Sequence, residues 1–203
     1  GPEKAGVSTL KAVKRAGRLS PLLAREVGVV AANALDGQAL RLVGTSVARM
    51  DIAAARAAIA RKFPNIDTSK VNDSAVKVTL ENTGGPSGGV IFTLGLIDLL
   101  TPEDLLQGRD IAGTGTISAN GKVGAIGGVT EKIIGAKKAG ASLLFVSREN
   151  CDQLPATVDG ISIIAINNID QAIDYLLKPI PGGKPAGKDL NSARIQGCAS
   201  VGA

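Results

Sequence analysis

The sequence predicts an α+β fold with β-hairpins, a mixed sheet and helices packed against it. Three observations support this class. The dipeptides Asp36-Gly37 and Asn120-Gly121 each lie between β-rich runs and are typical of tight hairpin turns. Helical patterns alternate with short apolar runs along the rest of the chain. The 203 residues, 44% of them hydrophobic, are enough for one core but few for two domains.

The first elements are a hairpin, a helix and a strand. The hairpin is expected between about residues 26 and 48, on either side of Asp36-Gly37. The alanine-rich run that follows has strong helix propensity, with Asp51 as its N-cap and Pro64 as its stop. Residues 75–82 then alternate apolar and polar side chains, which predicts a half-buried strand.

The remaining elements follow Ser87. A run that is apolar on nearly every side predicts a buried helix ending before Pro102, and a later helix ends at Gly140. Two buried strands (S-L-L-F-V-S and I-S-I-I-A-I-N) and an amphipathic helix (I-D-Q-A-I-D-Y-L-L-K) complete the series. We therefore expect a basic lead-in over residues 1–20, one domain over 21–179, and a mobile Pro/Gly-rich tail without regular structure over 180–203.

The composition limits the chemistry. The chain has no histidine, which excludes Ser-His-Asp and Cys-His arrangements, so an acyl transfer must use lysine or a carboxylate as its base. Two widely spaced cysteines, Cys151 and Cys198, do not have the spacing of a metal site, and we expect no metal. The sequence does not decide whether they pair, but we favour two free thiols because Cys198 lies in the predicted tail.

Charge and hydropathy leave several partners open. A net charge of +5 permits binding to nucleic acid or an anionic surface, although only 2% of residues are aromatic and could stack on bases. No apolar run reaches the roughly 18 to 20 residues needed to cross a bilayer, so no membrane span is expected. Localisation stays open: the cytoplasm is slightly favoured, and an anchored extracytoplasmic parent protein is the alternative.

Ser87 lies in the glycine-rich turn T-G-G-P-S-G-G and is a candidate nucleophile. A serine needs a base to remove its proton and donors to hold the oxyanion that forms. Glycines let the backbone approach a carbonyl closely, and a following helix presents unpaired amides. Because Pro86 has no N–H, the amides of Ser87 and Gly85 are the candidate oxyanion donors. The alternative is a flexible turn with Ser87 as a helix N-cap.

Lys132 is the candidate base. At 100° per residue, Lys132 lies within the small and apolar arc of its helix, whereas Lys137 and Lys138 lie with the solvent-facing residues. Burial of a lysine disfavours its charged form and makes the neutral amine available as a base. Alternatively, its stem covers the apolar face while its ammonium stays in water. Thr114 and Thr116 are short hydroxyls able to orient an amine, or ordinary strand residues.

Three blocks of the sequence resemble the proteolytic domain of the Lon proteases, peptidase family S16. They are G-G-P-S-G-G at 84–89, A-G-T-G-T-I at 112–117 and G-K-V-G-A-I-G-G-V-T-E-K at 121–132. The resemblance covers about residues 26–178 and implies a Lon-type α+β fold. It also implies Ser87 as nucleophile, Lys132 as general base and Thr114 as a hydroxyl that orients the lysine.

The sequence departs from the family pattern at three positions. Gly88 stands where alanine is usual, and Gly84 and Thr116 stand where many members carry acidic residues. No G-x-x-x-x-G-K-[ST] phosphate loop is present, so the chain resembles Lon-like proteases without an attached ATPase. We expect no cofactor in this chain, and ATP only through a separate ATPase partner.

These observations predict a serine endopeptidase that hydrolyses protein substrates through a Ser/Lys dyad and an acyl-enzyme. The resemblance also implies a homo-oligomer, commonly a six-membered ring, and leaves room for an ATPase or targeting domain outside this chain. Two rivals remain. One is a non-catalytic Lon-like scaffold or binding domain, and the other is a self-processing viral Ser/Lys protease.

Overall fold

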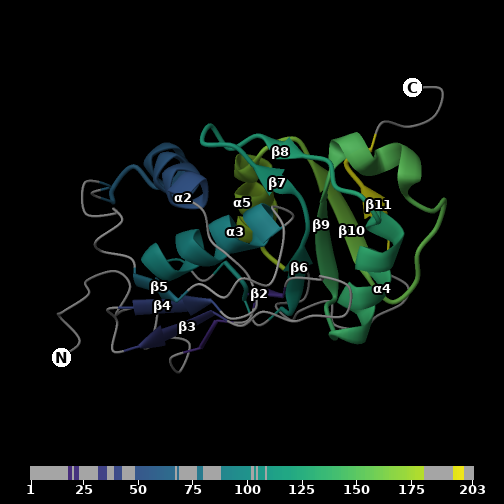
Figure 1. The fold of residues 1–203 in the computed structure, drawn as a ribbon, viewed down its shortest axis with the longest axis horizontal. Coiled ribbons are helices and arrows are strands. Elements are labelled where there is room, and N and C mark those ends of the chain that lie inside the picture. Colours follow the sequence, from purple (N-terminus) through teal and green to yellow (C-terminus); the bar gives the residue numbers. More distant parts are fainter. Residues whose placement is uncertain are drawn as a thin grey trace.

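The chain folds into an α+β structure, as predicted, in which helices cover both faces of a parallel sheet (Figure 1). The computed structural model describes residues 18–19, 21–22, 32–35, 39–42, 49–66, 68, 77–79, 88–101, 103, 105–107, 109–180 and 194–198. Among these residues, no helix is long and apolar enough to cross a membrane.

The central sheet has five strands in the order β11-β10-β9-β6-β2, and every neighbouring pair is parallel. Its strands are β2 (Pro21–Leu22), β6 (Ile111–Gly113), β9 (Leu143–Ser147), β10 (Ser162–Ile166) and β11 (Ile195–Gln196). All five residues of β9 are buried, because helices cover both faces of the sheet. The sequence shows this as the uninterrupted apolar run predicted to be a buried strand.

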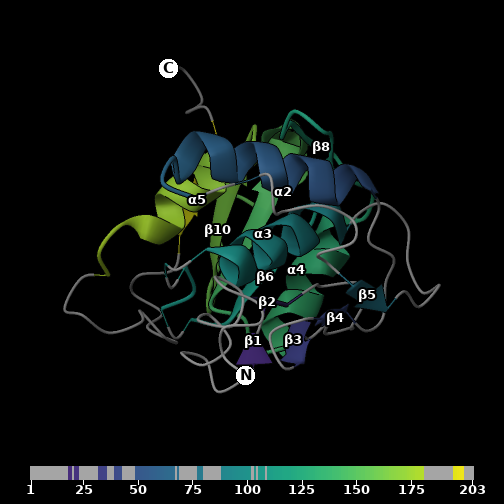
Figure 2. The same ribbon diagram turned by 90° about the vertical axis from the view of Figure 1, so that its left-hand side faces the viewer.

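A second sheet of four strands lies on the other side of α3 from α2 (Figure 2). It is formed by β1 (Arg18–Leu19), β3 (Ala32–Leu35), β4 (Ala39–Leu42) and β5 (Lys77–Thr79). The antiparallel pairing of β3 with β4 confirms the first predicted hairpin. Its turn dipeptide, Asp36-Gly37, lies outside the described residues, as does most of the basic lead-in predicted over 1–20.

Helices α3 (Gly89–Leu100) and α5 (Ile169–Leu177) cover one face of the parallel sheet, and α2 (Arg49–Lys62) packs against both of them. The prediction that Asp51 caps α2 is wrong, because the helix begins two residues earlier. Asp51 lies in its first turn, where a negative charge suits the helix dipole. Arg61 of α2 donates two hydrogen bonds to Asp170 of α5, at 2.8 and 2.9 Å. The Asp170 carboxylate raises the pKa of Arg61 and links the two helices.

Helix α4 (Val129–Lys138) covers the opposite face. It ends as predicted at Gly140, whose φ of +85° suits glycine. The amide of Gly140 donates to the carbonyl of Lys137, and the amide of Ala141 to that of Ala136, at 3.0 Å each. These two bonds form a Schellman motif, which stops the helix before β9 begins.

The second predicted hairpin is confirmed. β7 (Thr116–Ile117) and β8 (Val123–Gly124) pair antiparallel. Its turn is closed by the amide of Gly121, which donates to the carbonyl of Ser118 at 2.8 Å. Gly121 takes the positive φ of +90° that the turn requires.

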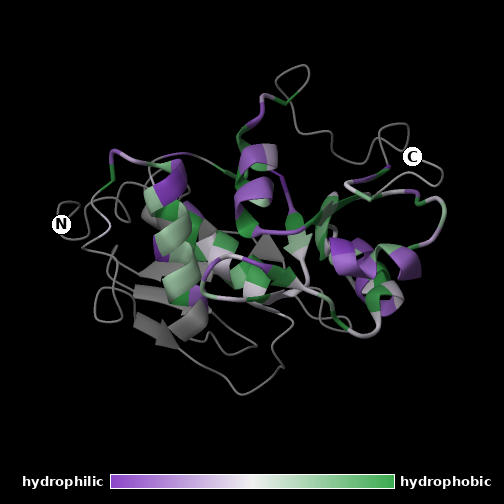
Figure 3. Ribbon diagram, turned by 90° about the horizontal axis from the view of Figure 1, so that it is seen from above, coloured by the Kyte–Doolittle hydropathy of each residue, from purple (hydrophilic) through white to green (hydrophobic). Residues whose placement is uncertain are grey.

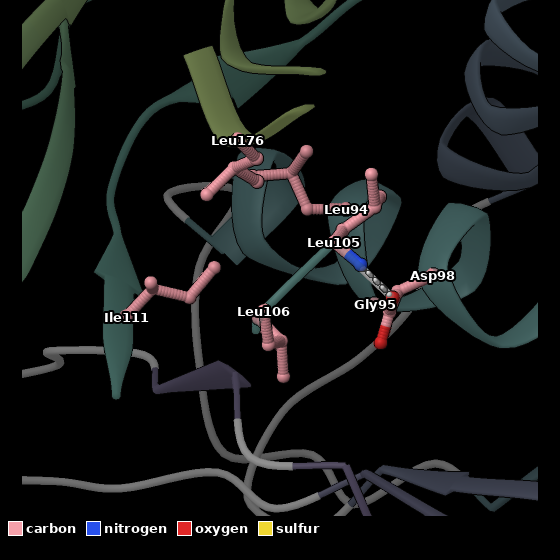
Figure 4. A pocket seen from close by; sticks show the side chains of 7 residues that line it. All are labelled: Leu94, Gly95, Asp98, Leu105, Leu106, Ile111 and Leu176. Carbon is pink, nitrogen blue, oxygen red and sulfur yellow. Dashed lines mark hydrogen bonds between the residues drawn. The ribbon is translucent and has the colours of Figure 1, made fainter. Parts of the chain in front are cut away.

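The apolar core lies where the helices meet the sheet, and hydrophilic residues lie on the outward faces of the helices (Figure 3). On the α3 side, the side chains of Leu94, Leu105, Leu106, Ile111 and Leu176 converge (Figure 4). The loop after α3 is held there by buried Asp98, whose Oδ1 accepts a hydrogen bond from the Leu105 amide at 3.0 Å.

The C-terminal segment corrects two predictions. Ile195–Gln196, within the predicted tail, forms strand β11 alongside β10, so this part of the chain has regular structure. Cys198 forms a disulfide with Cys151, in the 3₁₀ helix η4 (Arg148–Gln153), with an S–S distance of 2.07 Å. The expectation of two free thiols is therefore wrong. The composition of the tail did not show that residues 195–196, which follow a Pro/Gly-rich stretch, pair with β10 of the sheet.

Candidate active site

The predicted site residues are only partly within the described chain. Ser87 and Gly85 lie outside it, so their geometry stays a prediction. Gly88, the residue after Ser87, is buried and is the N-cap of α3, and no side chain in the described part of the chain caps this helix. The alternative that Ser87 serves as the N-cap is therefore wrong. The other part of that alternative, a flexible turn around Ser87, lies outside the described residues.

The first turn of α3 is fastened to the chain segment after β6. The amide of Val90 donates a hydrogen bond to the carbonyl of Gly115 at 3.2 Å. A Cβ on Gly89 would lie 2.8 Å from Cγ2 of Ile117 and 2.9 Å from its backbone nitrogen. Only glycine allows this close approach, which explains one glycine of the G-G-P-S-G-G block. The residues that follow Ser87 are thus held beside the Thr114 segment.

Thr114 directly follows β6 and is fully buried. Its amide donates to the carbonyl of Phe145 at 3.0 Å, which fixes the backbone against β9. Its hydroxyl Oγ1 has no hydrogen-bond partner among the described residues. A buried hydroxyl without a partner is costly and uncommon, which makes Thr114 a candidate for a functional role.

Lys132 lies on α4, in the arc that the helical wheel predicts. It is half-buried, whereas Lys137 and Lys138 are exposed. Val129 and Ile133, on either side of Lys132, belong to the same apolar cluster as Ala112 of β6. Helix α4 therefore covers the face of the sheet to which the Ala112 side chain of β6 belongs, opposite α3. The end of β6 is thus flanked by the helix that follows Ser87 and the helix that carries Lys132.

Comparison with known proteins identifies the family. A family model described as the Lon protease (S16) C-terminal proteolytic domain matches residues 38–179, well over half of the chain. The chain belongs to this family.

Individual relatives agree with this assignment. The chain is 34% identical to Lon protease 2 of Bacillus subtilis over 114 residues, which are 55% of this chain and 20% of that protein. It is 33% identical to the Lon protease of Trichlorobacter lovleyi over 108 residues, 51% of this chain and 13% of that protein. It is 36% identical to a mitochondrial Lon protease homologue of Candida dubliniensis over 100 residues, 47% of this chain and 9% of that protein. The matched region thus spans a fifth or less of these relatives.

The sequence did not predict the role of Asn150, which holds the start of α4, the helix that carries Lys132. The side chain of Asn150 accepts a hydrogen bond from the amide of Ile126 at 3.0 Å and donates one to its carbonyl at 2.9 Å. Ile126 begins the turn that leads through Gly128, in the left-handed conformation at φ +71°, into α4. Asn150 is 1% exposed and thereby sets where the helix carrying Lys132 starts.

The sequence contains no signal that identifies Asn150. It is a single asparagine, 24 residues away from its partner, within a polar stretch that is typical of a surface loop. Its burial depends on η4 folding back onto the α4 turn, which only the tertiary structure shows.

Proposed function

We propose that this Lon proteolytic domain is a serine endopeptidase in which Ser87 is the nucleophile and Lys132 the general base. The backbone amides of Ser87 and Gly85 are the proposed oxyanion donors. Thr114 is the proposed positioning residue for the lysine amine. The substrates are polypeptides, and no metal or other cofactor takes part in these steps.

In the proposed reaction, neutral Lys132 Nζ accepts the proton of the Ser87 hydroxyl as Oγ attacks the scissile carbonyl carbon. The carbonyl oxygen becomes an oxyanion held by the two amides. When the C–N bond breaks, the Lys132 ammonium returns its proton to the leaving amine, and an acyl-enzyme remains. Lys132 then deprotonates a water that attacks the ester, and Ser87 leaves with the proton returned to Oγ.

The observation that carries this proposal is the arrangement at the end of β6. The helix after Ser87 is fastened to Gly115, and the helix of Lys132 shares an apolar cluster with Ala112. Between these contacts lies Thr114, with a buried hydroxyl that has no partner among the described residues. A hydroxyl in this place is suited to accept a hydrogen bond from an amine or donate one to it.

Proteolysis of an unfolded protein such as casein tests the proposal. Wild type should cleave casein, and both Ser87→Ala and Lys132→Ala should abolish cleavage. Lys138→Ala is the matched control, because Lys138 is an exposed lysine on the same helix, and it should leave cleavage unchanged. Persistent cleavage in Ser87→Ala or Lys132→Ala would refute the dyad. Covalent addition of a serine-directed inhibitor at Ser87, seen by mass spectrometry, checks the nucleophile independently.

We also propose that the domain assembles with further copies of itself, as its family resemblance implies. Sedimentation velocity would show a ring-sized species, whereas a clean monomer at working concentration would contradict assembly of this chain alone. A folded chain that cleaves nothing would instead favour the scaffold or binding role.

A further inference from the structure

A cavity lies at the end of the parallel sheet where its strands begin. Thr114 follows β6 at the other end of the sheet. The cavity has a volume of about 280 Å³, and its lining includes two serines and three basic residues. Ser142 directly precedes β9, Ser162 opens β10, and Arg194 directly precedes β11. Arg109 lies two residues before β6. Because these strands are parallel, their first residues lie together at one end of the sheet.

The backbone around this cavity is held by hydrogen bonds between neighbouring strands. The amide of Ser162 donates to the carbonyl of Ser142 at 3.0 Å, and the amide of Ile163 to the carbonyl of Arg194 at 2.9 Å. Nε of Arg109 donates to the carbonyl of Leu106 at 3.0 Å. Its Nη2 also donates to the carbonyls of Leu105 and Leu176, so its positive charge is held in place. Hydrogen bonds within the protein therefore hold the cavity wall in place without a bound ligand.

The side chains lining this cavity carry one sign of charge. Arg109, Lys178 and Arg194 are cationic, and no carboxylate is among the described residues that line the cavity. Lys178 follows α5, and its Nζ lies 6.0 Å from the centre of the Tyr175 ring. Tyr175 in turn packs edge-on against Phe145, with ring centres 6.0 Å apart. Converging cations in a partly enclosed site attract anions, and guanidinium groups bind carboxylate and phosphate oxygens in pairs.

We propose that this cavity is a binding site for a small anionic ligand that carries phosphate or carboxylate oxygens. Lys178 and Arg194 supply the main contacts. The cavity volume is near the lower end for ligand sites, which fits a small molecule better than a folded partner. This site is separate from Thr114, which lies at the opposite end of β6.

The disulfide supports this site from a distance, because it holds β11, the strand that directly follows Arg194. β11 pairs with β10 through only two residue pairs, and Cys198 then joins it to Cys151. A Cβ on Gly197 would lie 2.1 Å from the carbonyl oxygen of Ala165, so the chain just after β11 stays close against the backbone of β10 on its way to the disulfide. Loss of the disulfide should release β11 and remove Arg194 from the cavity wall.

Titration calorimetry with pyrophosphate and with citrate, at constant ionic strength, tests the proposal. We expect wild type to bind at least one of the two anions with one-to-one stoichiometry, and the stronger binder identifies the phosphate or the carboxylate class. Lys178→Ala and Arg194→Ala should each weaken that binding about tenfold or more, since each removes a charged hydrogen-bond donor. Lys138→Ala, which changes the net charge equally on an exposed part of α4, should leave binding unchanged.

The disulfide arm uses Cys198→Ser, with circular dichroism to confirm that the variant stays folded. We expect this variant to bind as weakly as Arg194→Ala. Three results would overturn the proposal: no binding of either anion at 10 mM, equal weakening by Lys138→Ala, or unchanged binding in both Lys178→Ala and Arg194→Ala. Because none of these measurements uses proteolysis, they do not depend on the proposed peptidase activity.

Discussion

Replacement of Thr114 by valine separates a structural role of this residue from a functional one. Valine keeps the shape of threonine and exchanges the hydroxyl for a methyl group. The Thr114 hydroxyl is fully buried and has no partner among the described residues. An unpartnered buried hydroxyl costs about 1 to 3 kcal/mol, so Thr114→Val should leave the free energy of unfolding unchanged or raise it by about 1 to 2 kcal/mol. Urea unfolding monitored by circular dichroism measures this change.

The same substitution should lower proteolysis of casein. If the hydroxyl orients the amine of Lys132, its removal should reduce kcat about 10-fold to 100-fold with a smaller effect on KM. Thr114→Ser keeps the hydroxyl and should retain most of the activity. Thr114→Val would thus be a variant that is at least as stable as wild type and much less active.

Thr93 provides a matched control. It is also fully buried, and its hydroxyl also lacks a partner among the described residues, but it lies within α3. Thr93→Val should give the same small gain in stability without loss of activity. Full activity in Thr114→Val would refute the positioning role. A loss of more than about 1 kcal/mol in its stability would show that the hydroxyl is partnered in solution.

Four further substitutions test other parts of the structure. Asn150→Ala leaves the amide and carbonyl of Ile126 without partners and should lower the free energy of unfolding by about 2 to 4 kcal/mol in urea titration; a change below 0.5 kcal/mol would contradict this. Gly89→Ala places a methyl group against backbone and should cost about 1 to 3 kcal/mol by the same measurement, whereas a gain would show that α3 can shift freely. Cys198→Ser opens a loop with a sequence separation of 47 and should cost up to about 4 kcal/mol, and reduction of wild type should reproduce the loss. Asn168→Ala removes the capping box of α5, which should cost about 1 kcal/mol and lower Tm by about 2 to 4 °C in calorimetry; an unchanged Tm would contradict it.

Much of the fold was predictable because its signals are local. Asn120-Gly121 predicted the β7–β8 hairpin, since turn geometry depends on a few adjacent residues. The helical wheel placed Lys132 toward the sheet and Lys137 toward solvent, since a helix repeats every 3.6 residues whatever surrounds it. The boundary at Asp51 was wrong by two residues, because helix ends depend on how the preceding chain enters.

The candidate site was predictable only in part. Short motifs indicated Ser87, Lys132 and Thr114, because each motif brings its chemistry within a few residues. Asn150 was not predictable, since its role requires η4 to lie against a turn 24 residues earlier in the chain. The cationic cavity was equally hidden, because Arg109 and Arg194 are 85 residues apart and meet only when their strands enter one parallel sheet.

Local signals in the sequence were enough to predict the class of fold, the main helices and strands, and the residue types available for catalysis. Absence of histidine left lysine or a carboxylate as the base, and local periodicity selected Lys132. The tertiary structure decided the strand order, the return of the C-terminal segment as β11 and the pairing of Cys151 with Cys198. The physical reason is that turns and helix faces depend on neighbouring residues. Sheet order, buried hydrogen bonds and disulfides depend instead on segments that meet only in the folded chain.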